Sequence, residues 1–277
     1  MSKIETLVQD IYGLLGSDKE VSKKDINVLA DSLAVHITNA LRKRDTSRGL
    51  RASNLGVSCD RKSWYLYNNP ELAEDVEPWV KLKFLFGHIH EELVLFLAEQ
   101  AGHEVRDHQQ KISIDGVDGH LDAIIDNVVV DVKSANSRGM DKFRKHKLEE
   151  DDPFGYIPQI DFYYTGNEEL VEKEVAFIAC DKEMGHLVLD RYKKTNQDVL
   201  NTLLLIEHKK KVVALAEPPT RGFAPEPDGK SGNMKLGLTC KYCEFKNTCY
   251  PLLRTFLYSD GPRFLTHVVK EPDVKEI

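Results

Sequence analysis

The sequence feature that most constrains the fold is a pair of β-rich apolar runs separated by the dipeptide Asp126-Asn127. Asp and Asn tolerate the backbone conformations that a two-residue turn requires, and such a dipeptide between apolar runs is typical of a β-hairpin. The sequence therefore predicts a hairpin in which Ile125 faces Val128 across the turn.

This register places two carboxylates opposite each other. Counting outward from the turn, Asp122 faces Asp131, and side chains directly opposite on an antiparallel pair lie only about 5 Å apart at Cβ. Lys133 follows two residues after Asp131, so it points to the same face of the strand. Because two carboxylates at this distance repel, a fold rarely keeps them together without a proton or a cation between them. The hairpin therefore indicates a divalent metal site with an ammonium group beside it.

The composition describes an ordinary globular protein, since the 277 residues are 41% hydrophobic and 30% charged, with a formal net charge of -7. A chain of this length can bury a substantial core, and one elaborated α/β domain can reach it. The acidic balance gives no support to general nucleic-acid binding, but carboxylates gathered at a metal site are neutralised in use, so binding is not excluded. No apolar run approaches the roughly 18 residues that span a bilayer, and the start lacks a secretory core, so we expect a cytosolic protein.

Helical and strand-like spacing of apolar residues recurs along the rest of the chain. Residues 1–50 predict two helices, the second capped by Ser22 with Asp25, and this pair is interpreted as a packing or partner-binding element. Further elements are expected as helices beginning at Cys59 and Pro158 and over about 78–101, 137–147 and 192–216, and as strands over about 104–114, 171–180 and 186–190.

Two of the expected helices carry polar residues suited to a site. His90 lies at the border of an apolar stripe, and nearby Gly87 lowers helix stability, which suits close approach of a ligand or a backbone. Taken alone, this segment favours a core histidine bonded to a carbonyl. Gln159 and Tyr163 are four residues apart and share a helix face. Either side chain suits a phosphate or a catalytic water, and ordinary polar packing is an equal competitor.

Basic residues near two of these helices are candidate contacts for a phosphate backbone. The polar helix over about 137–147 is the most basic of them, although a solvated charged surface is the default interpretation of any charge run. The candidate DNA contacts are Arg61, Lys62, Arg138, Lys142, Arg144 and Lys145.

The cysteines are unevenly distributed, with Cys240, Cys243 and Cys249 inside ten residues. Clustered cysteines of an intracellular protein favour metal ligation, and Cys59, expected at a helix start that favours its thiolate, supplies a fourth ligand. Fe–S clusters take four thiolates, whereas structural zinc usually takes two paired knuckles. One distant cysteine plus a compact three therefore favours an Fe–S cluster, with zinc as the alternative. Cys180 ends an apolar run and is interpreted as a buried, inert thiol.

Together these segments resemble the RecB-like branch of the PD-(D/E)xK nucleases, and within it the iron–sulfur nucleases of CRISPR spacer acquisition and of AddB-type recombination complexes. The resemblance covers about residues 55–255, and its specificity lies in the ordered agreement of six motifs. Asp131 stands where Glu is also common, and residues 1–50 have no counterpart. The matching motifs are Cys59-Asp60-Arg61-Lys62, Gly87-His88-Ile89-His90-Glu91, Gly119-His120-Leu121-Asp122, Asp131-Val132-Lys133, Gln159-Ile160-Asp161-Phe162-Tyr163 and the triplet Cys240, Cys243 and Cys249.

The resemblance implies an α/β fold with a PD-(D/E)xK restriction-endonuclease-like core, in which a mixed central sheet is flanked by helices and the hairpin lies at the centre. It also implies three segments. These are an N-terminal helical extension at 1–50, a nuclease core at 51–216 whose Cys59 contributes to the cluster, and a C-terminal loop and Fe–S segment at 217–277.

The resemblance further implies roles for the site residues around one or two Mg²⁺ or Mn²⁺ ions. Such ions activate water and offset phosphate charge, and Mg²⁺ retains waters, so few protein ligands suffice. Lys133 would orient or deprotonate the attacking water, and orientation is the safer role because an ammonium must lose its proton to act as a base. A structural [4Fe-4S] cluster would staple the C-terminal segment to the helix after Cys59. The implied metal ligands are His90, Asp122, Asp131 and the Val132 carbonyl, and the implied catalytic residues are Asp122, Asp131, Lys133, Gln159 and Tyr163.

The resulting expectation is a metal-dependent DNA exonuclease that hydrolyses phosphodiester bonds on single-stranded ends. One alternative is a non-catalytic DNA-binding or recombination-complex subunit with the same fold, against which the intact set of Asp122, Asp131 and Lys133 argues. Another is a zinc-stapled enzyme of a different class. The chain has no G-x-x-x-x-G-K-[ST] motif, so any helicase or recombination motor would be a separate protein. A nuclease without a fused motor suits a phage or mobile element acting in a host cytoplasm.

Overall fold

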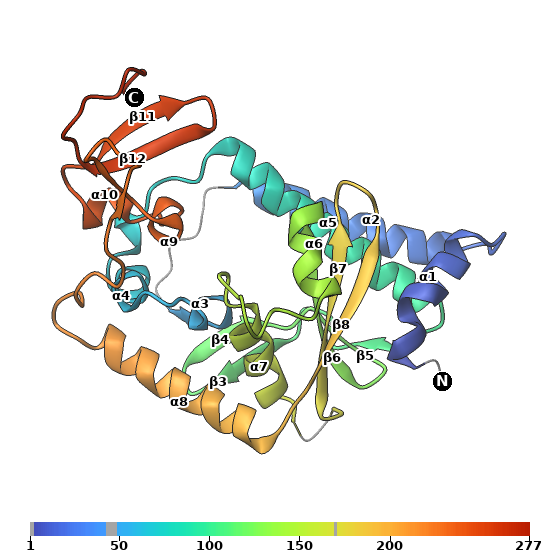
Figure 1. Ribbon diagram of the computed structural model, residues 1–277. Coiled ribbons are helices and arrows are strands. Elements are labelled where there is room, and N and C mark those ends of the chain that lie inside the picture. The colour runs from blue at the N-terminus through green and yellow to red at the C-terminus, as the bar shows by residue number, and fades with distance from the viewer. Residues whose placement is uncertain (1–2, 43–48, 169–170) are drawn as a thin grey trace. The chain divides into compact units, whose positions relative to one another are not determined.

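The computed structural model describes residues 3–42, 49–168 and 171–277. The chain divides into two compact units (Figure 1). The first contains the described residues of 1–45, 50–56 and 76–207, and the second those of 46–49, 57–75 and 208–277.

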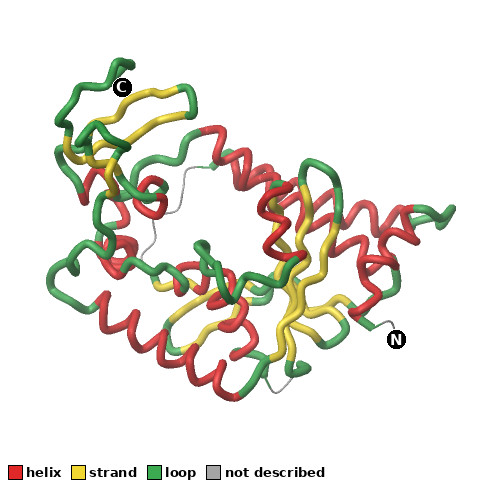
Figure 2. The backbone as a smooth tube through the Cα atoms, in the orientation of Figure 1, coloured by secondary structure: helices red, strands yellow, loops and turns green. Residues whose placement is uncertain are grey.

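A mixed five-stranded sheet forms the centre of the first unit, in the order β2-β5-β6-β7-β8. Strands β6 and β7 are parallel, and the other neighbours are antiparallel. Figure 2 shows the strands in yellow and the helices in red. A smaller sheet has the order β1-β4-β3. The strands are β1 (Leu50–Arg51), β2 (Val105–Arg106), β3 (Lys111–Ile114), β4 (Val117–His120), β5 (Ala123–Ile125), β6 (Val128–Ala135), β7 (Glu174–Asp181) and β8 (Leu187–Lys193).

Helices cover both faces of the central sheet, so the expected α/β class with a mixed, helix-flanked sheet is confirmed. On one face, Val129 and Phe177 pack with side chains of α6 and α7. On the other face, Val130 and Ile178 pack with side chains of α1 and α5, as the alternation along a strand requires. The helices of this unit are η1 (Ile4–Thr6), α1 (Leu7–Leu15), α2 (Lys23–Ala40), α3 (Ala52–Leu55), α5 (Pro78–Gln100), α6 (Ser137–Arg144) and α7 (Tyr156–Thr165), and α8 (Asn196–Val213) continues into the second unit.

The predicted hairpin is confirmed in both turn and register. Asp126 and Asn127 have φ angles of 50° and 68°, which is the left-handed conformation that a tight hairpin turn needs. Ile125 pairs with Val128, and Ala123 pairs with Val130. The hairpin therefore enters the sheet with the side-chain alternation that its sequence dictates.

Two element predictions are wrong. The expected strand over 104–114 is two short strands in different sheets, because Asp107 and Gln109 between them adopt left-handed φ angles of 56° and 54°. The expected helix start at Tyr192 is also wrong, because Tyr192 pairs with Val175 in the ladder between β7 and β8. The α8 helix begins only at Asn196.

The second unit combines a small apolar core with a four-stranded sheet in the order β11-β12-β10-β9, which the sequence did not predict. In its core the Phe245 ring stacks on Tyr65 with centroids 5.3 Å apart. None of the described helices is both long and apolar enough to cross a bilayer. The elements of this unit are α4 (Asp60–Asn68), η2 (Pro70–Leu72), β9 (Glu226–Pro227), β10 (Met234–Lys235), α9 (Leu238–Lys241), α10 (Lys246–Cys249), β11 (Arg254–Tyr258) and β12 (Gly261–His267).

Candidate active site

The hairpin brings two carboxylates together at the end away from its turn. Asp122 lies directly before β5, one step beyond the pair of Ala123 with Val130, and this register sets it opposite Asp131. Its Oδ2 accepts a hydrogen bond of 2.8 Å from the Val132 backbone N–H. Burial and the negative charge of Asp131 raise the pKa of Asp122 well above its ordinary value. The site therefore favours either a proton or a cation at Asp122.

Asp131 is the most deeply buried acid of the pair, with 1% of its surface exposed. Its Oδ2 is paired with the Lys133 ammonium, whereas its Oδ1 has no hydrogen-bond partner. Burial raises the pKa of Asp131, and the Lys133 charge offsets only part of that rise. Because a buried carboxylate oxygen without a donor is costly, Oδ1 of Asp131 fits the role of a cation ligand.

Lys133 is held in its charged form. Burial lowers the pKa of its ammonium, but the charges of Asp131 and Asp122 outweigh burial, and the pKa is raised overall. The ammonium also lies over the Tyr156 ring, 4.8 Å from its centroid. A lysine that keeps its proton is suited to orienting a water or a phosphate oxygen and not to accepting a proton.

On helix α5, the acid that acts on the hairpin carboxylates is Glu91. Its negative charge raises the pKa of both Asp122 and Asp131, and Gln109 donates a hydrogen bond to its carboxylate. His90 Nδ1 donates to the Phe86 carbonyl at 2.5 Å, which is the carbonyl-bonded arrangement. A ring held in this way leaves Nε2 as an acceptor atom, as in metal-binding histidines. Among the described residues, however, the ligand atoms of His90, Asp122 and Asp131 do not all lie within 4.8 Å of one another. Glu91 belongs to the Gly87-His88-Ile89-His90-Glu91 motif, but the sequence alone did not predict a role for it.

Gln159 and Tyr163 meet on helix α7, where Gln159 Nε2 donates to the Tyr163 hydroxyl at 3.3 Å. Burial raises the pKa of Tyr163 to about 12, and the charges of Asp131 and Asp122 add to this rise. Gly119 of β4 lets the Tyr163 ring lie close to the strand, because a Cβ on Gly119 would lie 2.8 Å from that ring. The glycine of the Gly119-His120-Leu121-Asp122 motif therefore allows α7 to pack beside the site.

Most of the basic candidates already have partners within the protein. Lys142 pairs with Asp151 at 2.7 Å, and Lys145 with Asp141 at 2.9 Å. Arg138 is an exposed residue of α6. The other contacts join Arg144 to Asp141 and Asp181 at 3.7 Å each, Arg61 to the Pro219 carbonyl at 2.6 Å, and Lys62 to Glu244 at 2.8 Å.

The four cysteines expected to bind a cluster are free thiols of the second unit. Cys59 is the residue that precedes α4, and Cys240 lies within α9. Burial raises the pKa of Cys240, and negative charge on Cys59 and Cys249 raises it further, so these thiols are electrostatic neighbours. Burial likewise raises the pKa of Cys243 to about 11. Thiols in this state need a metal to become thiolates at neutral pH.

The spacing of these thiols differs from that of a zinc site. Tetrahedral zinc with Zn–S bonds of about 2.3 Å holds its sulfur atoms only about 3.8 Å apart. In the described part of the chain, no three cysteine thiols lie within 4.8 Å of one another. An Fe–S cluster holds its thiolates further apart than one zinc ion does, because each binds a different iron. The described thiols are therefore not arranged as a mononuclear zinc site.

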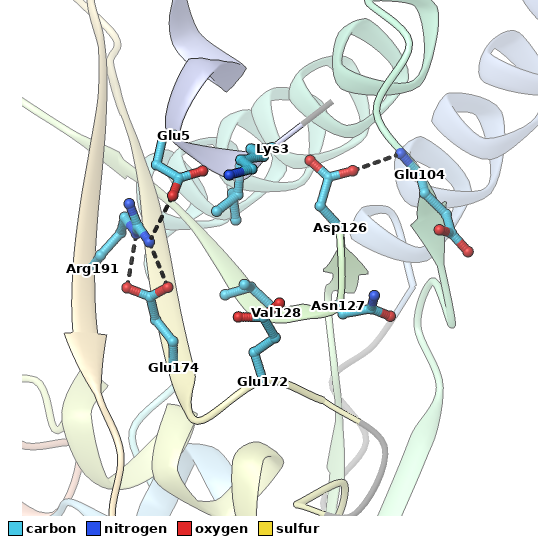
Figure 3. Close-up of a pocket in the computed structure, with 10 residues that line it drawn as sticks. Lys3, Glu5, Glu104, Asp126, Asn127, Val128, Glu172, Glu174 and Arg191 are labelled. Carbon is cyan, nitrogen blue, oxygen red and sulfur yellow. Dashed lines mark hydrogen bonds and ion pairs between the residues drawn. The ribbon is translucent and has the colours of Figure 1, made fainter. Parts of the chain in front are cut away.

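A polar pocket lies at the turn end of the hairpin, and Arg191, Glu174, Glu5 and Asp126 in its lining have partners within the pocket (Figure 3). Arg191 bonds Glu174 through Nε at 2.8 Å and through Nη2 at 2.6 Å, and Glu5 lies 3.5 Å from the same nitrogen. Asp126 accepts the Glu104 backbone N–H at 3.0 Å. These pairs tie the hairpin turn and η1 to the sheet, so we assign this pocket a structural role.

Comparison with known proteins gives only distant likenesses. No protein-family model matches the chain, and no curated protein matches its sequence. The crystal structure of SSO0001 has a TM-score of 0.43 and 16% identity, covering 82% of this chain and 96% of that one. LHK-Exo, solved with dAMP, has a TM-score of 0.33 and 11% identity, covering 74% and 86%, and the same exonuclease was also solved from Laribacter hongkongensis.

A phage-related exonuclease from Haemophilus somnus 129PT has a TM-score of 0.34 and 11% identity, covering 74% of this chain and 92% of that one. TM-scores below 0.5 carry no argument about activity. The chemistry of the site is therefore judged from its own residues.

Proposed function

We propose that this protein is a metal-dependent DNA nuclease that hydrolyses phosphodiester bonds, acting as an exonuclease on single-stranded ends. The observation that carries the proposal is the buried Asp131 carboxylate, with an oxygen that lacks a donor, placed opposite Asp122 and beside a charged Lys133. Mg²⁺ or Mn²⁺ would be held by Asp122 and Asp131, together with His90 and the Val132 carbonyl. The chemistry that such an ion supplies is activation of water and neutralisation of phosphate charge.

The protein's own residues contribute orientation and charge. The Val132 N–H fixes Asp122 Oδ2, so that this carboxylate keeps its place on the hairpin face. Lys133 keeps its proton and is a hydrogen-bond donor, which suits alignment of the attacking water or of a phosphate oxygen. Glu91 adds a third negative charge near the pair, which strengthens the attraction for a divalent cation.

Residues around the hairpin would position DNA. Tyr163 keeps a protonated hydroxyl because its pKa is raised to about 12, so it is a donor toward a phosphate or toward Lys133. Gln159 is fixed by its bond to that hydroxyl. Arg138 is exposed and is the candidate of α6 with the readiest access to a phosphate backbone.

In the second unit, Cys59, Cys240, Cys243 and Cys249 would hold a structural [4Fe-4S] cluster. The influence of Cys59 and Cys249 on the pKa of Cys240 supports a shared metal centre. Among the described residues no three cysteine thiols lie within 4.8 Å of one another, which argues against a single zinc ion. Bound to all four thiolates, the cluster would join the start of α4 to the segment around α9 and α10, where the apolar core is small.

The test uses anaerobically purified full-length protein with Mg²⁺ or Mn²⁺ and DNA labelled at the 5′ or 3′ end, with circular single strands beside linear ones. We expect degradation of linear single strands, intact circles, and loss of cleavage in Asp131→Ala and Lys133→Ala. The matched control, His186→Ala, changes an exposed residue of the β7–β8 turn and should keep activity. Binding without cleavage that Asp131→Ala leaves unchanged would instead favour a DNA-binding subunit with this fold, and inert protein would overturn both functions.

A further inference from the structure

An exposed aromatic ring is joined to the Lys133 ammonium through one other ring. Lys133 Nζ lies over the Tyr156 ring, 4.8 Å from its centroid. The Phe154 ring stacks on the Tyr156 ring with centroids 5.5 Å apart and an interplanar angle of 27°. Tyr156 packs against the core of the first unit, whereas Phe154 is 71% exposed. A single exposed apolar side chain is ordinary, so what distinguishes Phe154 is this contact with the site.

The backbone around Phe154 holds its ring in place. Gly155 has a φ of 73°, and a Cβ on Gly155 would lie 2.6 Å from the Cα of Gly56, so the two glycines pack backbone against backbone. Asp152 Oδ2 accepts the Ile157 N–H at 2.8 Å, and the Gly155 N–H donates to the Asp152 carbonyl at 3.3 Å. The turn is therefore fixed on both sides of Phe154, and a ring held in this way loses little freedom when a ligand binds to it.

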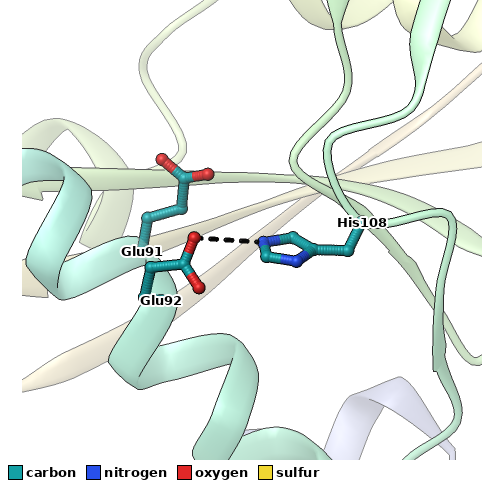
Figure 4. Close-up of side chains that lie close together, drawn as sticks. All are labelled: Glu91, Glu92 and His108. Carbon is teal, nitrogen blue, oxygen red and sulfur yellow. Dashed lines mark ion pairs between the residues drawn. The ribbon is translucent and has the colours of Figure 1, made fainter. Parts of the chain in front are cut away.

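Charge around the hairpin carboxylates is uneven. Helix α5 packs on the face of the sheet opposite to that of Tyr156. Figure 4 shows Glu91 and Glu92 projecting from α5, with the His108 ring directed at Glu92. Because carboxylates repel phosphate, a DNA backbone at Lys133 is directed away from Glu91 and toward the Tyr156 side.

Acidic residues directly precede the turn of Phe154, and they determine what its ring can bind. Asp151 pairs with Lys142 at 2.7 Å, whereas Glu149 and Glu150 are exposed. Negative charge beside the ring disfavours a phosphate there, but it does not repel an uncharged nucleobase. Every base has a π-face on which an aromatic side chain can stack. The ring is therefore suited to a base of the strand and not to its backbone.

We propose that Phe154 is a stacking platform for one nucleobase of a single strand whose phosphate lies at Lys133 and the hairpin carboxylates. This inference rests on the proposed nuclease function and deepens it, because it names a contact that favours single strands. A base inside a duplex has both faces covered by its neighbours, whereas an unpaired base offers a free face. The ring selects for an unpaired base and not for a sequence.

The experiment measures the Kd of full-length, anaerobically purified protein for an end-labelled single strand of mixed sequence, in chelator so that metal-dependent cleavage is prevented. Phe154→Ala should raise the Kd by about 5- to 150-fold. Phe154→Leu keeps apolar bulk without a π-face and should show a similar loss, whereas Phe154→Tyr and Phe154→Trp should bind like the wild type. The factor should be the same at low and high salt, because stacking releases no counterions.

A strand of the same length built of abasic sugar-phosphates separates stacking from packing. The effect of Phe154→Ala should vanish on this strand, because ring and base contribute to one contact. The matched control is Leu15→Ala, which truncates another exposed apolar side chain, 62% exposed on α1, and should bind like the wild type.

The proposal is overturned if Phe154→Ala and Phe154→Leu both retain the wild-type Kd for the mixed-sequence strand. An equal loss on the abasic strand would also overturn it, since Phe154 would then act only by packing on Tyr156. Cleavage by the wild type in Mn²⁺ together with an unchanged Kd in Phe154→Ala would reject this inference and leave the proposed function standing. Wild-type protein that neither binds nor cleaves DNA would reject both.

Discussion

Asp122→Asn should stabilise the metal-free protein while abolishing metal-dependent activity. The amide keeps the shape of the carboxylate and can still accept the Val132 N–H. It removes a charge that burial, Asp131 and Glu91 all disfavour. We expect a gain of about 2 kcal/mol in the free energy of unfolding in chelator at pH 7, within the range of about 1–4 kcal/mol that is gained when buried charges are replaced by uncharged groups of similar volume. For a chain of this size that gain raises Tm by about 4–8 °C.

The effect should depend on pH in one direction. The pKa of Asp122 is raised in the folded state, so the folded protein holds its proton at pH values where the unfolded chain has released it. The loss of folding stability caused by Asp122 grows as pH rises through the ordinary pKa of about 3.9 toward the folded pKa, and it is absent below that ordinary value. The difference in Tm between variant and wild type should therefore shrink as pH falls from 7 toward about 4.

Thermal unfolding in chelator measures the stability of the metal-free variant, and thermal unfolding in Mn²⁺ measures its stabilisation by the metal. A ligand at 100 times its Kd stabilises the folded state by about 2.7 kcal/mol, and this gain should be smaller in Asp122→Asn. The control Asp181→Asn should have the opposite sign, because burial raises the pKa of Asp181 but hydrogen bonds from the Glu183 and Met184 backbone outweigh burial and lower it. A metal-free Asp122→Asn protein less stable than wild type would refute the reasoning.

Three further substitutions have expected outcomes. Gly119→Ala should destabilise the protein by about 1–3 kcal/mol in a denaturant titration, because its Cβ would lie 2.6 Å from the Ala52 Cβ; unchanged stability would show that α3 and α7 can move apart. Tyr163→Phe should keep Tm within a few degrees and lower the cleavage rate about tenfold or more, and an unchanged rate would leave its hydroxyl only a packing role. Cys249→Ala should lose iron and the brown colour of anaerobic protein, whereas colourless wild type with stoichiometric zinc would reject the cluster.

The local sequence pattern was sufficient to predict the hairpin and most of the helices. The turn residues Asp126 and Asn127 and the alternation on either side depend on neighbours in sequence, and the observed pairing of Ile125 with Val128 follows from them. The cap of α2 is similarly local, since Ser22 Oγ accepts the Asp25 N–H at 3.1 Å. The position of Asp122 opposite Asp131 could therefore be predicted without knowledge of the tertiary fold.

What the sequence did not indicate depends on distant contacts. Glu91 and Glu92 look like surface acids of a helix, and their burial arises only where α5 meets the hairpin, α2 and the loop of His108. The apolar pattern near 104–114 looks continuous, and the left-handed residues at Asp107 and Gln109 break it. Strands β9 and β10 have two residues each, so their pairing is not visible as alternation. The hairpin of β11 and β12, in which Tyr258 pairs with Gly261, is local and was missed.

The central claim is that the hairpin carboxylates bind a divalent cation, and anomalous X-ray scattering from crystals soaked in Mn²⁺ tests it most directly. Wild-type crystals should show a manganese peak between Asp122 and Asp131, and the peak should be absent in crystals of the Asp131→Ala variant. A wild-type map without manganese at the hairpin, at a Mn²⁺ concentration that supports DNA cleavage, would contradict the account.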